Sequence, residues 1–289
     1  MLANNLTMIL VMERAIHITK LENLERWNYR YQRIYWGAEF CQNLIPEIEE
    51  TEKVLRFVED RNLSFTLVTP FVTERGLEKL EEIFEWLKAN RASCEIVVND
   101  WGVLEMLRRD NGFFKIALGR LLTRQQRDPS IKKLLKKQLP TAVKTKDDKI
   151  IIYVHRVPAK SYQTGIKKSY LNSKSAQDFL SRLGVERVEL NNIIQGLNVE
   201  GLYLRKSLYT PYINISTTRF CPMETKYQKI YRINVCKKEC QARYDELRNK
   251  GISKVIYKIG NTTFYRNPVK ISGAINFGVD RIVYQLLNC

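Results

Sequence analysis

The chain has 289 residues, a hydrophobic fraction of 44% and a formal net charge of +17. This is the composition of a folded globular protein, and it excludes a largely disordered chain. No segment approaches the run of about 20 apolar residues that a membrane helix needs, and no basic run precedes the apolar segment Leu6–Met12 as it would in a signal peptide. We therefore expect a soluble, cytoplasmic protein without a membrane span.

Strand and helix patterns alternate over the first 120 residues. The expected strands are Leu6–Met12, Arg33–Trp36, Ser64–Phe71, Cys94–Val98 and Phe113–Leu118, and the expected helices are 47–61, Glu74–Ala89 and Trp101–Asp110. Strand–helix units that follow one another at about 30 residues or fewer imply a parallel sheet with right-handed crossovers. We predict an α/β fold with a parallel-strand, TIM-barrel-like domain, and the pattern leaves open whether the barrel is incomplete or distorted.

The charge is distributed unevenly along the chain. Residues 1–110 carry a net charge of −5 and the remaining 179 residues carry +22. Within the second part, residues 132–174 hold 12 Lys and Arg but only two acidic residues. Such a segment favours a polyanionic partner, RNA first, although an acidic protein partner and a merely solvated basic face remain alternatives. The candidate nucleic-acid contacts are Lys132, Lys133, Lys136 and Lys137.

We interpret residues 132–174 as an insertion between barrel units. They contain a predicted strand at Lys149–Val154, and residues 146–149 suit a hairpin turn before it. The elements expected after the insertion are a helix at Ser175–Leu183, strands at Arg187–Leu190, Tyr212–Ser216, Lys254–Ile259 and Thr262–Arg266, and a closing helix at Gly278–Leu287. Gly260-Asn261 predicts a tight hairpin turn between the last two strands. We expect one domain over residues 1–289.

Four of the six cysteines are candidate ligands of a shared centre. Cys236 and Cys240 are separated by three residues, and Cys221 precedes them in the same region. Cys41 lies just beyond the predicted strand Arg33–Trp36, at the edge where α/β folds place their sites. Four thiolates suit a [4Fe–4S] cluster or a structural zinc ion, although zinc sites usually contain C-x2-C pairs. The spacing alone also leaves unligated thiols open.

The other two cysteines fit different places. Cys94 opens an apolar strand and is expected to be a small buried core residue. Cys289 ends the chain, and a frayed terminus makes a poor ligand. We expect neither to take part in the centre.

Three polar residues are candidates for substrate or acid–base roles at the same edge. Glu39 and Asp100 follow predicted strands, and Arg120 follows the strand that ends at Leu118. Each has a simpler alternative, because Glu39 and Asp100 could cap the next helix and Arg120 could be a solvated cation. The only histidines, His17 and His155, lie in no H-E-x-x-H or G-x-S-x-G pattern, and no phosphate-binding glycine loop is present.

Several short segments resemble the peptidase U-32 family, which is collagenase-like. The segments are Ile34–Cys41 (I-Y-W-G-A-E-F-C), Ile96–Val103 (I-V-V-N-D-W-G-V), Ser216–Cys221 (S-T-T-R-F-C) and the Cys236-x3-Cys240 pair. They are most similar to the branch of the family that serves ubiquinone biosynthesis. The resemblance covers residues 30–125 and 186–245 in patches, and neither the basic stretch 132–174 nor the N-terminus has a counterpart in it.

The resemblance implies a barrel-like fold and a function. It implies a [4Fe–4S] cluster held by Cys41, Cys221, Cys236 and Cys240, with the last three on a loop at 216–245. It also implies a role in oxygen-independent hydroxylation together with a paralogous subunit. Other relatives hydroxylate transfer or ribosomal RNA, which the basic stretch would suit. A protease is the least favoured hypothesis, because no catalytic constellation is present.

Overall fold

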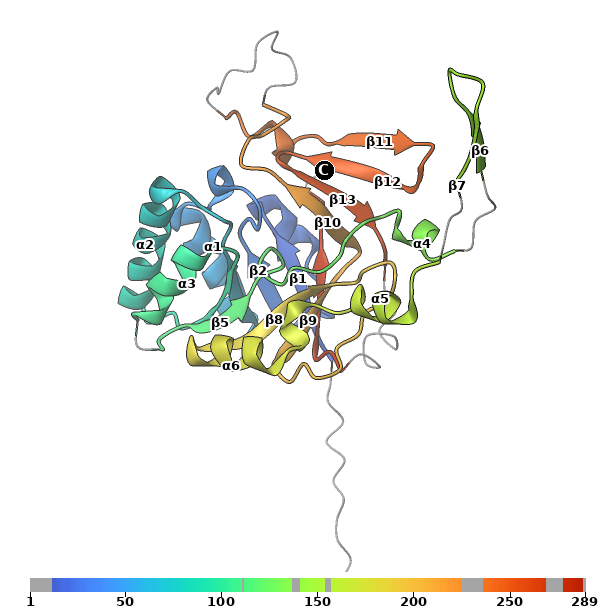
Figure 1. The fold of residues 1–289 in the computed structure, drawn as a ribbon. Coiled ribbons are helices and arrows are strands. Elements are labelled where there is room, and N and C mark those ends of the chain that lie inside the picture. The colour runs from blue at the N-terminus through green and yellow to red at the C-terminus, as the bar shows by residue number, and fades with distance from the viewer. Residues whose placement is uncertain are drawn as a thin grey trace, which may run out of the picture.

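Eight parallel strands close into a barrel (Figure 1). The computed structural model describes residues 12–110, 112–136, 141–153, 157–224, 236–268 and 278–287. In spatial order the barrel strands are β1 (Glu13–Ile18), β14 (Arg281–Gln285), β9 (Arg205–Thr210), β8 (Val185–Asn191), β5 (Lys115–Leu118), β4 (Glu95–Val98), β3 (Ser64–Val68) and β2 (Arg33–Trp36). Every neighbouring pair is parallel. The predicted TIM-barrel-like α/β class is confirmed, and the barrel is closed.

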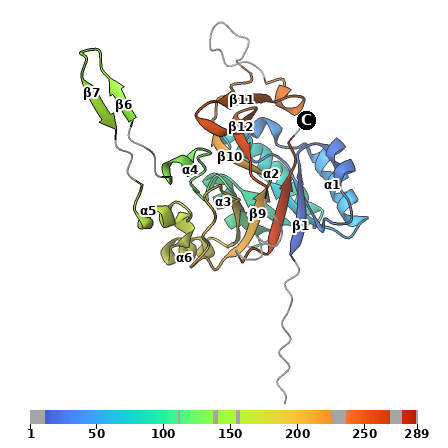
Figure 2. The same cartoon turned by 90° about the vertical axis from the view of Figure 1, so that its right-hand side faces the viewer.

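Helices cover the outside of the barrel (Figures 1 and 2). The regular ones are α1 (Ile48–Glu59), α2 (Glu74–Ala89), α3 (Trp101–Arg108) and α6 (Lys174–Arg182), and shorter turns are η1 (Leu21–Arg26) and η2 (Gln42–Leu44). α2 buries Leu80, Ile83 and Leu87 at helical spacing, which is why the sequence predicts its bounds so well. Among the described residues, no helix has the length and apolar character needed to cross a membrane.

A second sheet lies over the carboxyl-terminal end of the barrel (Figure 1). It is antiparallel, in the order β10 (Tyr212–Thr217), β13 (Thr262–Arg266), β12 (Ile252–Ile259) and β11 (Asp245–Asn249). β10 continues directly from the carboxyl end of β9, so this sheet starts where the barrel ends. Ile213, Ile256 and Tyr265 form its small core, and isoleucines from outside the sheet complete it.

The basic insertion separates β5 from β8 in sequence, although the two strands are neighbours in the barrel. It contains α4 (Ile131–Leu134), β6 (Thr141–Lys144), β7 (Ile150–Tyr153), α5 (Lys160–Gly165) and η3 (Tyr170–Asn172). β6 and β7 form the predicted hairpin, which projects away from the barrel in both views (Figures 1 and 2). Lys132, Lys133 and Lys136 are exposed, and Lys137 lies outside the described residues.

Three expectations about the elements need correction or qualification. The closing helix predicted at Gly278–Leu287 is wrong, because β14 occupies this segment and lies between β1 and β9. A short β-branched apolar run fits a fully buried parallel strand as well as a helix, and periodicity alone does not separate the two. β9 was not predicted. The strand expected at Leu6–Met12 lies almost wholly outside the described residues, and β1 begins at Glu13, so that His17 lies within a strand.

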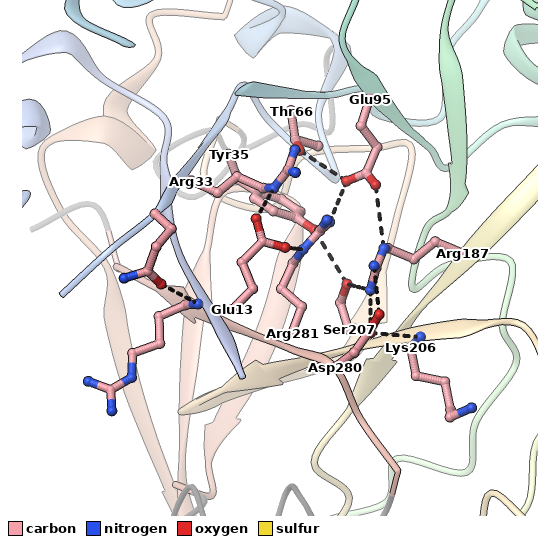
Figure 3. A network of polar contacts seen from close by, with 12 residues as sticks. Glu13, Arg33, Tyr35, Thr66, Glu95, Arg187, Lys206, Ser207, Asp280 and Arg281 are labelled. Atoms are coloured by element: carbon pink, nitrogen blue, oxygen red, sulfur yellow. Dashed lines mark hydrogen bonds and ion pairs between the residues drawn. The ribbon is translucent and has the colours of Figure 1, made fainter. Parts of the chain in front are cut away.

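Ion pairs fill the amino-terminal end of the barrel (Figure 3). Glu13 accepts from Arg33 at 2.7 Å and from Arg281 at 2.6 Å. Arg187 forms two hydrogen bonds with Asp280, at 2.6 and 2.9 Å. Glu95, Thr66, Tyr35 and Ser207 complete the network. Because each charge is paired and hydrogen-bonded, the barrel tolerates these groups at a position where most such folds pack apolar residues.

One carboxyl group near this network is not paired with a cation. Glu189 on β8 is completely buried, and its Oε1 accepts from the Tyr35 hydroxyl at 3.1 Å. Its Oε2 has no hydrogen-bond partner among the described residues. Burial, followed by the negative charge of Glu95, raises the pKa of Glu189 to about 7.

We expect Glu189→Gln to stabilise the chain near neutral pH. The unfolded chain loses this proton near pH 4.5 and the folded chain near pH 7, so the wild-type stability falls as the pH rises across that window, by up to about 3 kcal/mol. Glutamine has no proton to lose and avoids this penalty. Urea unfolding at about pH 5 and about pH 8 should therefore show a gain for the variant that is larger at the higher pH. An equal gain at both values would contradict the assignment.

Candidate functional site

Arg120 closes the carboxyl-terminal end of the barrel interior. Its Nε donates to Glu39 at 2.8 Å, and its Nη2 donates to the second oxygen of Glu39 and to Gln285. Its Nη1 donates to Asn191 Oδ1 and to the Tyr212 carbonyl oxygen, both at 3.1 Å. These five bonds use all five N–H donors of the guanidinium. The side chains of Arg120 and Glu39 are completely buried, so in this conformation neither is available to a substrate.

Asp100 acts as a helix cap. Its Oδ1 accepts from the Gly102 backbone N–H at 2.7 Å at the start of α3, and its Oδ2 accepts from the Val72 backbone N–H at 3.3 Å. The structure therefore shows the capping role that the sequence left as an alternative. The residue still lies at the carboxyl rim, because it closely follows β4.

His17 is buried inside the barrel between two tyrosine rings. Its Nε2 donates to the Gly37 carbonyl oxygen at 2.9 Å, and the rings of Tyr35 and Tyr209 lie edge-on to it at 6.3 and 6.0 Å. Burial lowers the pKa of His17, so the imidazole is neutral at physiological pH. Its Nδ1 has no partner among the described residues, and these surroundings are those of a core histidine. His155 lies outside the described residues.

Four cysteine thiols gather beyond the carboxyl ends of the barrel strands. Cys41 follows β2 and precedes η2, Cys221 follows β10, and Cys240 lies in η4 (Glu239–Gln241), four residues after Cys236. Burial first, together with negative charge on Cys236 and Cys221, raises the pKa of Cys41 to about 11. Burial first, together with negative charge on each of the other three thiols, raises the pKa of Cys240 to about 12. The four groups are thus electrostatic neighbours.

Backbone N–H groups point at two of these sulfur atoms. The backbone N–H groups of Asn43 and Leu44 hydrogen-bond to the Cys41 thiol and lower its pKa, against the larger effect of burial. The Lys238 backbone N–H donates to Cys236 Sγ at 3.4 Å. N–H donors of this kind stabilise thiolate sulfur.

The cysteines lie between two hollows. Cys41 and Cys240 border a cavity of about 60 Å³ whose apolar wall includes Phe40 and Phe264, with the rings 5.5 Å apart. Cys221 and Cys236 border a larger basin of about 860 Å³. Glu47 pairs with Lys79 at 2.6 Å in this basin. The charged residues that line the basin are Arg75, Lys79, Arg219, Lys238, Glu47 and Glu224.

Two further observations complete the description of the sulfur groups. Within the described ranges, no three His, Cys, Asp or Glu side chains converge closely enough to hold a single metal ion. Cys94 is buried in the main core, as expected, and burial raises its pKa to about 12. Cys289 lies outside the described residues.

Sequence reasoning missed the residue that connects the cysteine segments. The Asn261 side chain donates to the Phe40 carbonyl oxygen at 2.6 Å and to the Thr218 carbonyl oxygen at 2.8 Å. The Gly-Asn pair was visible as a turn signal. Nothing in the sequence linked that turn to cysteines more than 200 residues away or on another strand.

Comparison with known proteins gives two similar solved structures. No protein-family model and no curated protein matches the chain. A structure described as the U32 peptidase Mk0906 covers 96% of this chain and 93% of its own, with 12% identity and a TM-score of 0.47. A glycoside hydrolase family 18 N-acetylglucosaminidase from Paenibacillus barengoltzii covers 95% and 94%, with 8% identity and a TM-score of 0.36. We assign the barrel from its strand pairing. We describe the cysteine site from the hydrogen bonds and close approaches within this chain.

We expect Arg120→Met to destabilise the chain strongly, because it leaves the buried carboxylate of Glu39 without a counter-charge. The decrease in the free energy of unfolding should be about 3–5 kcal/mol. The double variant Arg120→Met with Glu39→Gln should recover part of this decrease, because no buried charge remains unpaired. Urea unfolding measures both. A single variant as stable as the wild type would contradict the buried ion pair.

Proposed function

We propose that the chain is an iron–sulfur protein that holds a [4Fe–4S] cluster through Cys41, Cys221, Cys236 and Cys240. The observation that carries the proposal is the position of the four cysteines, which come from separate segments of the chain: Cys41 and Cys240 line one cavity, and Cys221 and Cys236 line one basin. Four cysteine thiolates are the usual ligand set of such a cluster. A structural zinc ion is the alternative with the same ligands, but the C-x3-C pair and the distant fourth cysteine are less typical of it.

The four cysteines would supply four thiolates to a cationic centre. Without a metal, burial and mutual repulsion keep Cys41 and Cys240 protonated, as their pKa values of about 11 and about 12 indicate. Iron ions would supply the positive charge that makes the thiolates favourable. The N–H donors at Cys41 and Cys236 would offset the negative charge of the sulfur atoms.

We further propose that the site supports oxygen-independent hydroxylation. The support is the resemblance of segments 34–41, 96–103 and 216–221 to the U-32 family, and most closely to its ubiquinone-biosynthesis member UbiV, which works with a paralogous subunit. When bound, the cluster would supply electron transfer or Lewis acidity at the barrel mouth. The chain itself supplies the apolar wall of Phe40 and Phe264, and a basin with four basic and two acidic residues through which an anionic substrate or partner could approach.

Anaerobic purification with iron and sulfide should yield a brown protein with about four irons per chain. Cys236→Ala should lose the colour and most of the iron, because one ligand is removed. Cys94→Ala is the matched control, because Cys94 is also a cysteine but packs in the barrel core. A colourless preparation with stoichiometric zinc, or colour that survives in Cys236→Ala, would contradict the ligand set.

We propose RNA binding by the basic insertion as a second candidate function. It is favoured by the exposure of Lys132, Lys133 and Lys136 and by the hairpin that projects from the barrel. Under this hypothesis the basic insertion provides the phosphate contacts and the cysteine site modifies the bound RNA. Phosphate neutralisation by lysine dominates binding of this kind.

Neutralising the lysine cluster should weaken RNA binding and its salt dependence together. The variant replaces Lys132, Lys133, Lys136 and Lys137 by Gln. The slope of log affinity against log salt should become shallower by about 0.7–0.9 for each phosphate that the variant no longer neutralises. Lys53→Gln with Lys115→Gln, on the barrel body, serves as the control. Binding of structured RNA that is unchanged by the quadruple substitution would exclude this lysine cluster as the contact surface.

A further inference from the structure

We propose that the Gly260-Asn261 turn between β12 and β13 positions the cysteine site, with Asn261 as its positioning residue. This role rests on the proposed cluster site. The turn is the place where the segments that carry Cys41, Cys221 and Cys240 meet.

Asn261 connects two of these segments through its carboxamide. Its Nδ2 donates to the carbonyl oxygen of Phe40, the residue before Cys41, and to the carbonyl oxygen of Thr218, three residues before Cys221. Its own backbone carbonyl oxygen accepts from the Thr218 N–H at 3.0 Å. The residue is only 8% exposed, so these bonds are largely shielded from competing water. Both N–H donors of the amide are used, each on a different cysteine segment.

The third segment, which carries Cys240, packs closely against Gly260. Its φ of 57° is in the left-handed region, and a Cβ placed there would lie 3.2 Å from Cys240 Cβ and 3.3 Å from Cys240 Sγ. Its backbone N–H donates to the sulfur of Met223, two residues after Cys221, at 2.9 Å. Any side chain at position 260 would therefore strain the turn and press on Cys240.

These contacts explain what the appended sheet does for the site. Cys41 belongs to the barrel rim, whereas Cys221 and Cys240 belong to segments at the edge of the second sheet. Phe264 on β13 packs edge-on against Phe40 and brings the turn to the rim. The turn then fixes the distance between the barrel cysteine and the sheet cysteines, which loops alone would leave variable.

Asn261→Ala and Asn261→Asp test the role, and Asn267→Ala is the matched control. Asp keeps the shape of the side chain but has neither N–H donor. Asn267 lies at the opposite end of β13 from Asn261. Its Nδ2 also donates to a backbone carbonyl oxygen, that of Asn192 at 2.7 Å, and no cysteine segment takes part in that bond. Circular dichroism checks that each variant folds.

The first readout uses the metal-free chain. Dibromobimane cross-links neighbouring thiols, and mass spectrometry quantifies the peptide pair that contains Cys41 and Cys221. Removing the two hydrogen bonds should lower this cross-link by about tenfold in both Asn261 variants, with Asn267→Ala at the wild-type level. The second readout is the electron paramagnetic resonance spectrum and iron content after anaerobic reconstitution, which should change in the Asn261 variants only.

Wild-type cross-linking and an unaltered spectrum in both Asn261 variants would overturn the positioning role. If neither variant folds, Gly260→Ala replaces them, and an undiminished cross-link there would overturn it equally. A wild-type chain that shows the cross-link, with the cross-link absent in Asn261→Ala, yet takes up no iron, would refute the proposed cluster while supporting the role of the turn.

Discussion

The buried guanidinium of Arg120 holds the two layers of this molecule together. It extends from the end of β5, binds Glu39 beyond β2, reaches Asn191 on β8 and Gln285 on β14, and donates to the Tyr212 backbone in the second sheet. A charge with every donor paired in a water-free interior fixes one arrangement, because any alternative leaves a buried charge unpaired. The second sheet is therefore fixed over the barrel mouth. The arrangement of the four cysteines depends on that placement, because they come from both layers.

The two ends of the barrel use polar groups differently. At the amino-terminal end, Arg33, Arg187 and Arg281 pair with carboxylates in a closed network (Figure 3). At the carboxyl-terminal end, the pairing of Arg120 and Glu39 forms a floor, and above it lie sulfur atoms with raised pKa values and a small cavity. The first arrangement satisfies its own charges. In the second, burial and mutual repulsion raise the pKa values of Cys41 and Cys240, so both thiols are protonated.

The sequence predicts those features whose causes are local. The bounds of β2 and α2 agree with the structure because a buried strand and a long amphipathic helix carry their own periodicity. β9 was not predicted from the sequence because Arg205–Thr210 is largely polar, and Ser207 within it joins the ionic network. The roles of Arg120 and Asn261 could not be predicted from the sequence for another reason. Their partners lie up to 221 residues away in the chain, and only the closed barrel and the appended sheet bring them into contact.

X-ray absorption at the iron edge of the anaerobically reconstituted protein tests the central claim most directly. A [4Fe–4S] cluster on four cysteines predicts an all-sulfur first shell around iron and a second shell of neighbouring iron atoms. A first shell of nitrogen or oxygen, an iron spectrum without iron neighbours, or metal present only as zinc with sulfur at about 2.3 Å would contradict it.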